Sequence, residues 1–111
     1  MNNNRKKLNN ENEEITKDFP LLKFKPEMTK KMKVRYNNPD DFNKNFIIES
    51  TDDIINIRNK EISIESKSSE FIRLTFVMPK TFGNYAASVI VKNKDINQIE
   101  EILRFHMQVT V

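Results

Sequence analysis

The strongest constraint on the fold is a two-residue period of apolar side chains on both sides of the chain's only glycine, Gly83. The residues that recur in phase are Ile72, Leu74, Phe76 and Met78 before the glycine and Tyr85, Ala87, Val89 and Val91 after it. This period is typical of strands that bury one face. We therefore expect residues 71–78 and 85–91 to form an antiparallel hairpin, turning at residues 82–84, at the centre of a β-sandwich.

Further strands are expected along the rest of the chain, separated by turn-forming residues. They are residues 18–26, 29–36, 45–50, 54–57, 61–65 and 101–111. The first contains Pro20 and ends at Pro26, and prolines are tolerated at a sheet edge. About seven or eight short strands at this spacing predict an all-β, immunoglobulin-like sandwich of antiparallel strands. No alternation of strands with helices suggests a parallel sheet.

The last strand has a competing interpretation. Within residues 95–104, the side chains Ile96, Ile99, Ile102 and Leu103 also fall at helical spacing. We favour a strand because strict alternation continues to the end of the sequence. Residues 92–98 are polar and are expected to be a hairpin loop, although they lack the glycine that a tight turn prefers.

Length and composition indicate a single small domain preceded by a tail. In 111 residues there is room for one core but not for a deep pocket. Residues 1–17 carry few aliphatic side chains and are predicted to be a disordered tail, which leaves residues 18–111 as the domain. No apolar run approaches the ~20 residues of a membrane span, so we expect a cytoplasmic protein without membrane insertion.

The sequence lacks the residue groups on which enzyme chemistry usually depends. One glycine argues against phosphate-binding loops, while one histidine and no cysteine leave few ways to build a nucleophile or metal site. The histidine, His106, is expected on the outward face of the last strand. Tyr85 is expected to act structurally, either by tying down a loop through its hydroxyl or as a plain core aromatic. We predict no catalytic residue, no metal and no cofactor.

The most suggestive surface feature is a basic row at Lys30, Lys31, Lys33 and Arg35, which Lys23 and Lys25 would extend. Such a row could bind an acidic partner, such as a tubulin tail or an acidic peptide. The alternative is that lysines on a strand near a sheet edge prevent unwanted pairing. Nucleic acid is not expected, because no aromatic side chain is interleaved for base stacking.

Several segments together resemble a known superfamily. They are Lys33-Val-Arg-Tyr-Asn-Asn-Pro, Asn45-Phe-Ile-Ile-Glu-Ser-Thr-Asp-Asp-Ile-Ile-Asn-Ile, Ile72-Arg-Leu-Thr-Phe-Val-Met-Pro with Gly83 shortly after, and Val89-Ile-Val-Lys-Asn. Their order resembles the major sperm protein (MSP) and Hydin-type (ASH) immunoglobulin-like superfamily, with a PapD-like sandwich, over residues 19–111. Within that superfamily the sequence is most similar to the sandwich domains of nephrocystin-4.

The resemblance implies a non-enzymatic interaction module. Its expected setting is a scaffold of the cilium, basal body, axoneme or centrosome, with other proteins of such a complex as partners and a place on the cytoskeleton. The alternative that the resemblance offers is an adaptor of the major sperm protein type, which captures acidic peptide motifs at membrane contact sites.

Overall fold

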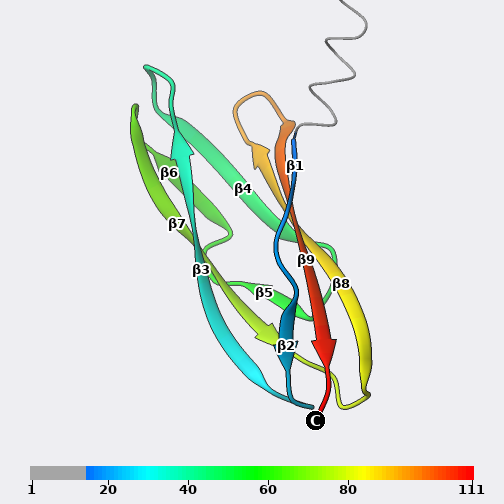
Figure 1. Ribbon diagram of the computed structural model, residues 1–111. Helices are drawn as coiled ribbons and strands as arrows, with labels where there is room; N and C mark the ends of the chain where they lie inside the picture. The colour runs from blue at the N-terminus through cyan, green and yellow to red at the C-terminus, as the bar shows by residue number, and fades with distance from the viewer. Residues whose placement is uncertain (1–14) are drawn as a thin grey trace, which may run out of the picture.

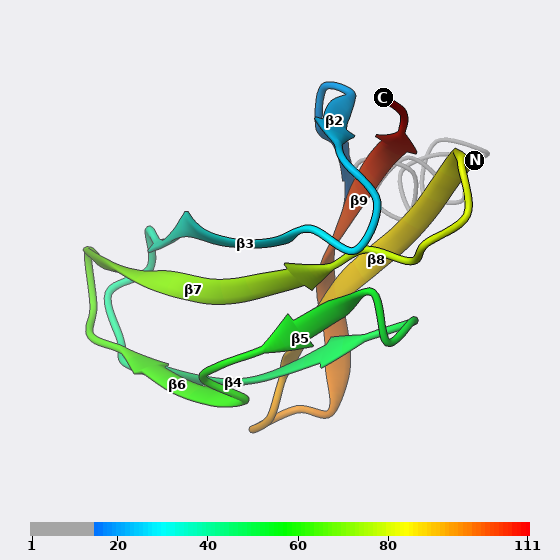
Figure 2. The same ribbon diagram turned by 90° about the horizontal axis from the view of Figure 1, so that it is seen from below.

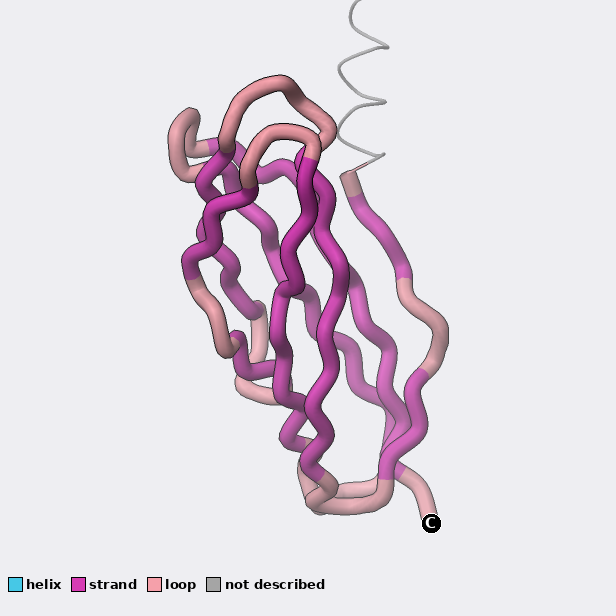
Figure 3. The backbone as a smooth tube through the Cα atoms, turned by 90° about the vertical axis from the view of Figure 1, so that its left-hand side faces the viewer, coloured by secondary structure: helices cyan, strands magenta, loops and turns pink. Residues whose placement is uncertain are grey.

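The computed structural model describes residues 15–111, and within that range every regular element is a β-strand. The nine strands are β1 (Thr16–Asp18), β2 (Leu22–Phe24), β3 (Thr29–Asn38), β4 (Lys44–Ser50), β5 (Ile55–Ile57), β6 (Glu61–Ile64), β7 (Ser68–Val77), β8 (Gly83–Asn93) and β9 (Gln98–Val109). Figure 1 shows their course, and Figure 3 shows that loops connect them mainly at the two ends of the molecule. The predicted all-β class is confirmed.

The strands form two sheets that pack face to face. The larger sheet has the order β1-β9-β8-β4-β6, with β2 also pairing with β9, and the smaller one has the order β3-β7-β5. Figure 2 shows the three strands of the smaller sheet side by side. From β2 to β8, each strand lies in the opposite sheet from the one before it.

The core fills the space between the two sheets and is built largely from alternate residues of the long strands. Phe76 on β7 meets Phe105 on β9 edge to face, with ring centroids 5.4 Å apart. Phe24 stacks on Phe76 at 5.7 Å, and Phe19 stacks on Phe105 at 4.4 Å. Burying each such ring contributes about 1.5–3 kcal/mol. The aromatic stack therefore joins the two sheets through their inner faces.

The predicted central hairpin is wrong, because β7 and β8 belong to different sheets. The alternation correctly identified which residues are buried, since Ile72, Leu74 and Phe76 face the same core as Val89 and Val91. The alternation could not show which strands pair with each other. Two half-buried strands can face the same core either as neighbours in one sheet or as members of the two opposed sheets. Gly83 begins β8 with a φ of 150°, which side-chain-bearing residues rarely adopt.

The start of the domain also differs in detail. The expected strand over residues 18–26 is divided into β1 and β2 around Pro20, which has no N–H to donate to a ladder. Both pieces pair with β9 in parallel, whereas all strands were expected to be antiparallel. They lie at the edge of the larger sheet, as the prolines predicted. Thr16 and Lys17 were predicted to belong to the tail but are part of β1, and the predicted tail up to residue 14 lies outside the described residues.

The last element, β9, is a strand, as predicted, and not the competing helix over residues 95–104. In β9 the buried residues are Leu103, Phe105, Met107 and Val109, in strict alternation. The loop between β8 and β9 manages without glycine because Asn97 takes a positive φ of 54°, a conformation that asparagine tolerates better than most residues.

Candidate functional site: a basic sheet face

Five cationic side chains lie on the outer face of the smaller sheet. They are Lys31, Lys33 and Arg35 on β3, Arg73 on β7, and Arg58 directly after β5, and we call them the basic face. Lys33 is directly opposite Arg73 in the β3–β7 register. The Arg58 N–H donates to the Arg73 carbonyl at 2.8 Å, so a cation from each of three neighbouring chain segments falls in one line across the sheet.

Asn59 fixes the position of Arg58 beside β7. Its Oδ1 accepts a hydrogen bond from the Arg73 N–H at 2.8 Å, and its Nδ2 donates to the Phe71 carbonyl at 2.8 Å. The amide thereby takes the place of a backbone partner just where β5 has ended. Arg58 is consequently held against the sheet instead of leaving with the loop that follows.

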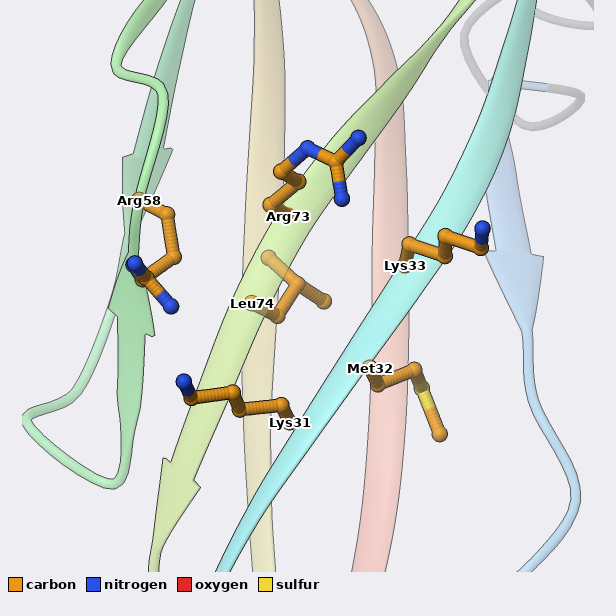
Figure 4. Close-up of a pocket in the computed structure, with 6 residues that line it drawn as sticks. All are labelled: Lys31, Met32, Lys33, Arg58, Arg73 and Leu74. Carbon is orange, nitrogen blue, oxygen red and sulfur yellow. The ribbon is translucent and has the colours of Figure 1, made fainter.

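The middle of the basic face is a shallow hollow of about 250 Å³. Its lining consists of Lys31, Met32, Lys33, Arg58, Arg73 and Leu74. Figure 4 shows Lys31 extended across β7 toward Arg58, while Lys33 is directed to the other side of β3. An open hollow of this kind suits a side chain or an extended segment of a partner better than an enclosed small molecule.

The charges of the basic face are not neutralised by the rest of the described chain. Within residues 15–111, none of the five cations lies within ion-pair distance of a carboxylate, although seven other basic residues do. Phe71 lies beneath Lys33 and Arg35, with its ring centroid 4.5 Å from Lys33 Nζ and 5.4 Å from Arg35 Cζ. These contacts orient the cations but leave their charge available to a partner.

The residues of the predicted basic row do not all lie on one face in the structure. Lys31, Lys33 and Arg35 share the outer face, but Lys30, although exposed, lies at the opposite parity of β3. Lys23 on β2 and Lys25 just after it belong to the larger sheet's edge and do not extend the row. Arg58 and Arg73 were not predicted to belong to this face. The outward parity of Arg73 between buried Ile72 and Leu74 could have indicated it, whereas the position of Arg58 depends on Asn59.

A second polar cluster, at one end of the sandwich, is structural. Glu100 accepts hydrogen bonds from Lys44 Nζ and Asn93 Nδ2, both at 3.1 Å. Burial, reinforced by the carboxylates Glu100 and Glu101, raises the pKa of the Tyr36 hydroxyl far above its ordinary range. Burial alone would lower the pKa of Lys44, but its hydrogen bonds to Asp40 and Glu100 outweigh this effect and raise it. The cluster ties β3, β4 and the β8–β9 hairpin together.

The remaining candidate residues also make structural contacts. His106 is on the outer face of β9, with Nε2 3.1 Å from Asp18 Oδ1, and so links β9 to β1. The Tyr85 hydroxyl donates to the Thr81 carbonyl at 2.7 Å, which ties the β7–β8 connection to β8. Over residues 15–111, no group of three or more His, Asp or Glu side chains is arranged to hold a metal ion.

Over the same residues the structure contains no apolar helix of membrane-spanning length.

Neither a protein-family model nor a curated protein matches the sequence. Solved structures match in fold. SSP-19, an MSP-domain-like family member of Caenorhabditis elegans, is 11% identical with a TM-score of 0.58, covering 78% of this chain and 91% of that one. The ASH/PapD-like domain 7 of human CEP192 is 16% identical with a TM-score of 0.59, covering 86% and 81%.

A family 123 glycoside hydrolase from Clostridium perfringens contains a similar sandwich. It is 11% identical with a TM-score of 0.67, and the match covers 86% of this chain but only 23% of the enzyme. Identities this low show a shared fold alone. The predicted immunoglobulin-like sandwich, a fold that MSP and ASH/PapD-like domains also have, is thus confirmed.

Proposed function

We propose that this chain is a non-enzymatic protein-binding module that serves as a scaffold in a centrosomal, basal-body or ciliary assembly, with its basic face as the contact for an acidic partner. A tubulin tail or an acidic peptide would be such a partner. The observation that carries the proposal is the set of five cations on one sheet face that lack ion-pair partners among residues 15–111.

The arrangement of these cations is costly for the fold itself. Like charges at directly opposite positions of a sheet are destabilising, and here Lys33 is opposite Arg73 in the register, with the backbone of Arg58 bonded to that of Arg73 on its other side. Protection of a sheet edge against unwanted pairing would explain the cations on β3. They do not account for Arg73, which lies on the middle strand, or for Arg58 on the far side of it. Binding an acidic partner would explain all five.

Two observations support the cellular setting. The fold is shared with the ASH/PapD-like domain of CEP192. The motifs at residues 33–39, 45–57 and 72–79 resemble those of the superfamily that occurs in centrosomal and ciliary proteins, nephrocystin-4 among them. In such an assembly the chain would lie in the cytoplasm, on the cytoskeleton.

Microtubule co-sedimentation tests the partner. The chain should bind intact microtubules in low salt and bind weakly once the acidic tubulin tails are removed by proteolysis. The double variant Lys31→Glu, Lys33→Glu should lose this binding. A matched control is Lys80→Glu, Lys94→Glu, which reverses two exposed lysines in loops away from the basic face. Equal loss in both variants would show that net charge, and not the basic face, is responsible.

Imaging of a tagged copy in its source cell tests the setting. The scaffold function predicts concentration at basal bodies, centrosomes or axonemes. Accumulation at the endoplasmic reticulum would instead favour the adaptor of the major sperm protein type. Diffuse signal in cells whose basal bodies are well labelled by a marker would contradict the scaffold function.

A further inference from the structure

The outer edge of β3 is open, and its unpaired backbone groups belong to the basic residues. Within residues 15–111, β3 pairs only with β7. On β7, the Arg73 carbonyl accepts from Arg58 and the Val77 N–H donates to Ile54, both at 2.8 Å, so the odd-numbered residues direct their backbone groups toward β5. Even-numbered residues of β7 therefore bond to β3.

The β3–β7 register shows which residues of β3 direct their backbone N–H and C=O groups to the open edge. Lys33 is opposite Arg73 and Lys31 is opposite Thr75, both odd-numbered residues of β7. In an antiparallel ladder, such opposed residues direct their N–H and C=O groups away from each other. The N–H and C=O groups of Lys31, Lys33 and Arg35 consequently face outward, where a further strand could pair with them.

The two faces of the sheet beside this edge differ in chemistry. On the outer face are the cationic side chains of Lys31, Lys33 and Arg35. On the inner face are Met32 and Val34, which are only partly buried although they pack against the core. A strand added at this edge would therefore have cations beside every second residue and apolar side chains beside the residues between.

We infer that β3 captures an extended segment of the partner as an additional strand of the smaller sheet, with acidic residues at every second position and apolar residues between them. This inference rests on the proposed function and specifies how the acidic partner is held. Backbone hydrogen bonds to the open edge give affinity, and the alternation of acidic and apolar side chains gives specificity. The acidic residues would lie opposite Lys31, Lys33 and Arg35.

A second copy of this chain does not fit the same edge. In an antiparallel pair of β3 strands centred on Lys33, each lysine would face the other, and Lys31 would face Arg35. Like charges in directly opposite positions are destabilising. The charge pattern of β3 therefore selects an acidic strand over another copy of itself, which is how lysines on an edge also prevent aggregation.

The test uses the full chain and synthetic peptides of about nine residues, a length that covers most of β3. The first peptide has glutamate at every second position with valine or threonine between. Two derivatives carry N-methyl groups, either on the glutamates or on the residues between them. A fourth peptide has the same composition with its glutamates in one block. Binding is measured by fluorescence anisotropy at low and moderate salt.

The alternating peptide is expected to bind, and the block peptide to bind at least about tenfold more weakly, because its carboxylates cannot all meet the cations. Methylation in one frame should weaken binding about tenfold or more, while methylation in the other frame leaves it unchanged, because only alternate N–H groups face β3. The frame that is sensitive reports whether the added strand is antiparallel or parallel. Lys31→Glu, Lys33→Glu should abolish binding, and Lys80→Glu, Lys94→Glu should not.

The outcomes separate this inference from the proposed function. If the alternating peptide binds and loses binding on Lys31→Glu, Lys33→Glu but neither methylation matters, the basic face binds acidic partners and strand addition is wrong. If neither acidic peptide binds the chain, both ideas are overturned. Dimerisation of the chain that Lys33→Glu changes would show that β3 pairs with itself, which also overturns the inference.

Discussion

At the scale of single residues, Asn38 shows how one buried amide organises a turn. It is 1% exposed, its Nδ2 donates to the carbonyls of Phe42 at 2.8 Å and Ile64 at 3.0 Å, and its Oδ1 accepts from the Asp40 N–H at 3.1 Å. Replacing it by alanine leaves these groups without partners. We expect Asn38→Ala to lower the free energy of unfolding by about 2–3 kcal/mol.

Urea denaturation would measure this loss, and the neighbouring residue provides the control. Asn37 is exposed on the same strand, so Asn37→Ala should stay within about 0.5 kcal/mol of the parent chain. If the two variants had equal stability, the hydrogen bonds of Asn38 would not be important for the turn.

Glu101 is a residue whose charge opposes folding. Burial, with a contribution from neighbouring Glu100, raises the pKa of its carboxyl above the ordinary value, despite the opposing effects of Lys17 and Tyr36. Because the pKa of this carboxyl is higher in the folded protein than in the unfolded chain, the protonated form favours folding. This contribution to stability is complete below the unfolded pKa and is lost as the pH rises through the folded pKa.

Glu101→Gln should therefore raise the free energy of unfolding at neutral pH. The expected gain is about a few tenths of a kcal/mol, because solvent screens a carboxyl that is only partly buried. The difference between the two proteins should shrink as the pH falls toward 4.5, the ordinary pKa of a glutamate. Denaturation curves at several pH values would check this, and a gain that stayed constant with pH would point to packing instead of charge.

At the scale of elements, the central strand β7 carries a charge that its own sheet disfavours. Arg73 lies opposite Lys33 on one side and is hydrogen bonded through its backbone to Arg58 on the other. We expect Arg73→Gln to raise the free energy of unfolding by about 0.2–1 kcal/mol, and to weaken binding of an acidic partner. The gain should diminish in high salt, where the repulsion is screened.

Arg104 provides the matched comparison on the other sheet. Its guanidinium lies 3.7 Å from Asp18, so Arg104→Gln removes an attractive contact and should give no gain in stability. Thermal unfolding of both variants at low and high salt would distinguish the two cases. A loss of stability in Arg73→Gln would mean that the arginine contributes packing that outweighs the repulsion.

The individual strands were largely predictable, whereas their partners were not. The alternation at Met32, Val34 and Tyr36 predicted β3 and its basic outer face, because a half-buried strand needs one apolar side only. The same kind of alternation could not reveal that β7 and β8 part into different sheets, since pairing depends on the rest of the chain. Arg58 lies on the basic face because the side chain of Asn59 is hydrogen bonded to the backbone of β7, a contact that sequence spacing does not specify.

At the scale of the whole molecule, stability depends on the aromatic stack between the sheets. Phe105 is fully buried and contacts Phe19 as well as Phe76. Phe105→Ala should lower the free energy of unfolding by about 3–5 kcal/mol, since it removes the contacts and leaves a cavity. Phe82→Ala, at a site that is 58% exposed, should change it by less than about 0.5 kcal/mol.

Equilibrium unfolding in urea measures both variants. Because the two substitutions remove the same side chain, a similar loss in both would contradict the assignment of the core. Loss of a single cooperative transition in Phe105→Ala would show that the stack also couples the two sheets into one unit.

The alternation of successive strands between the two sheets has a consequence for how the chain reaches its fold. Neither sheet can be assembled from a continuous piece of sequence, and the larger one needs β9 beside β8, β1 and β2. Most contacts must therefore close long loops before any layer is complete, and topologies of this kind fold over milliseconds to seconds. During synthesis the larger sheet can be completed only after β9 has left the ribosome, so we expect the domain to fold in one step and not sheet by sheet.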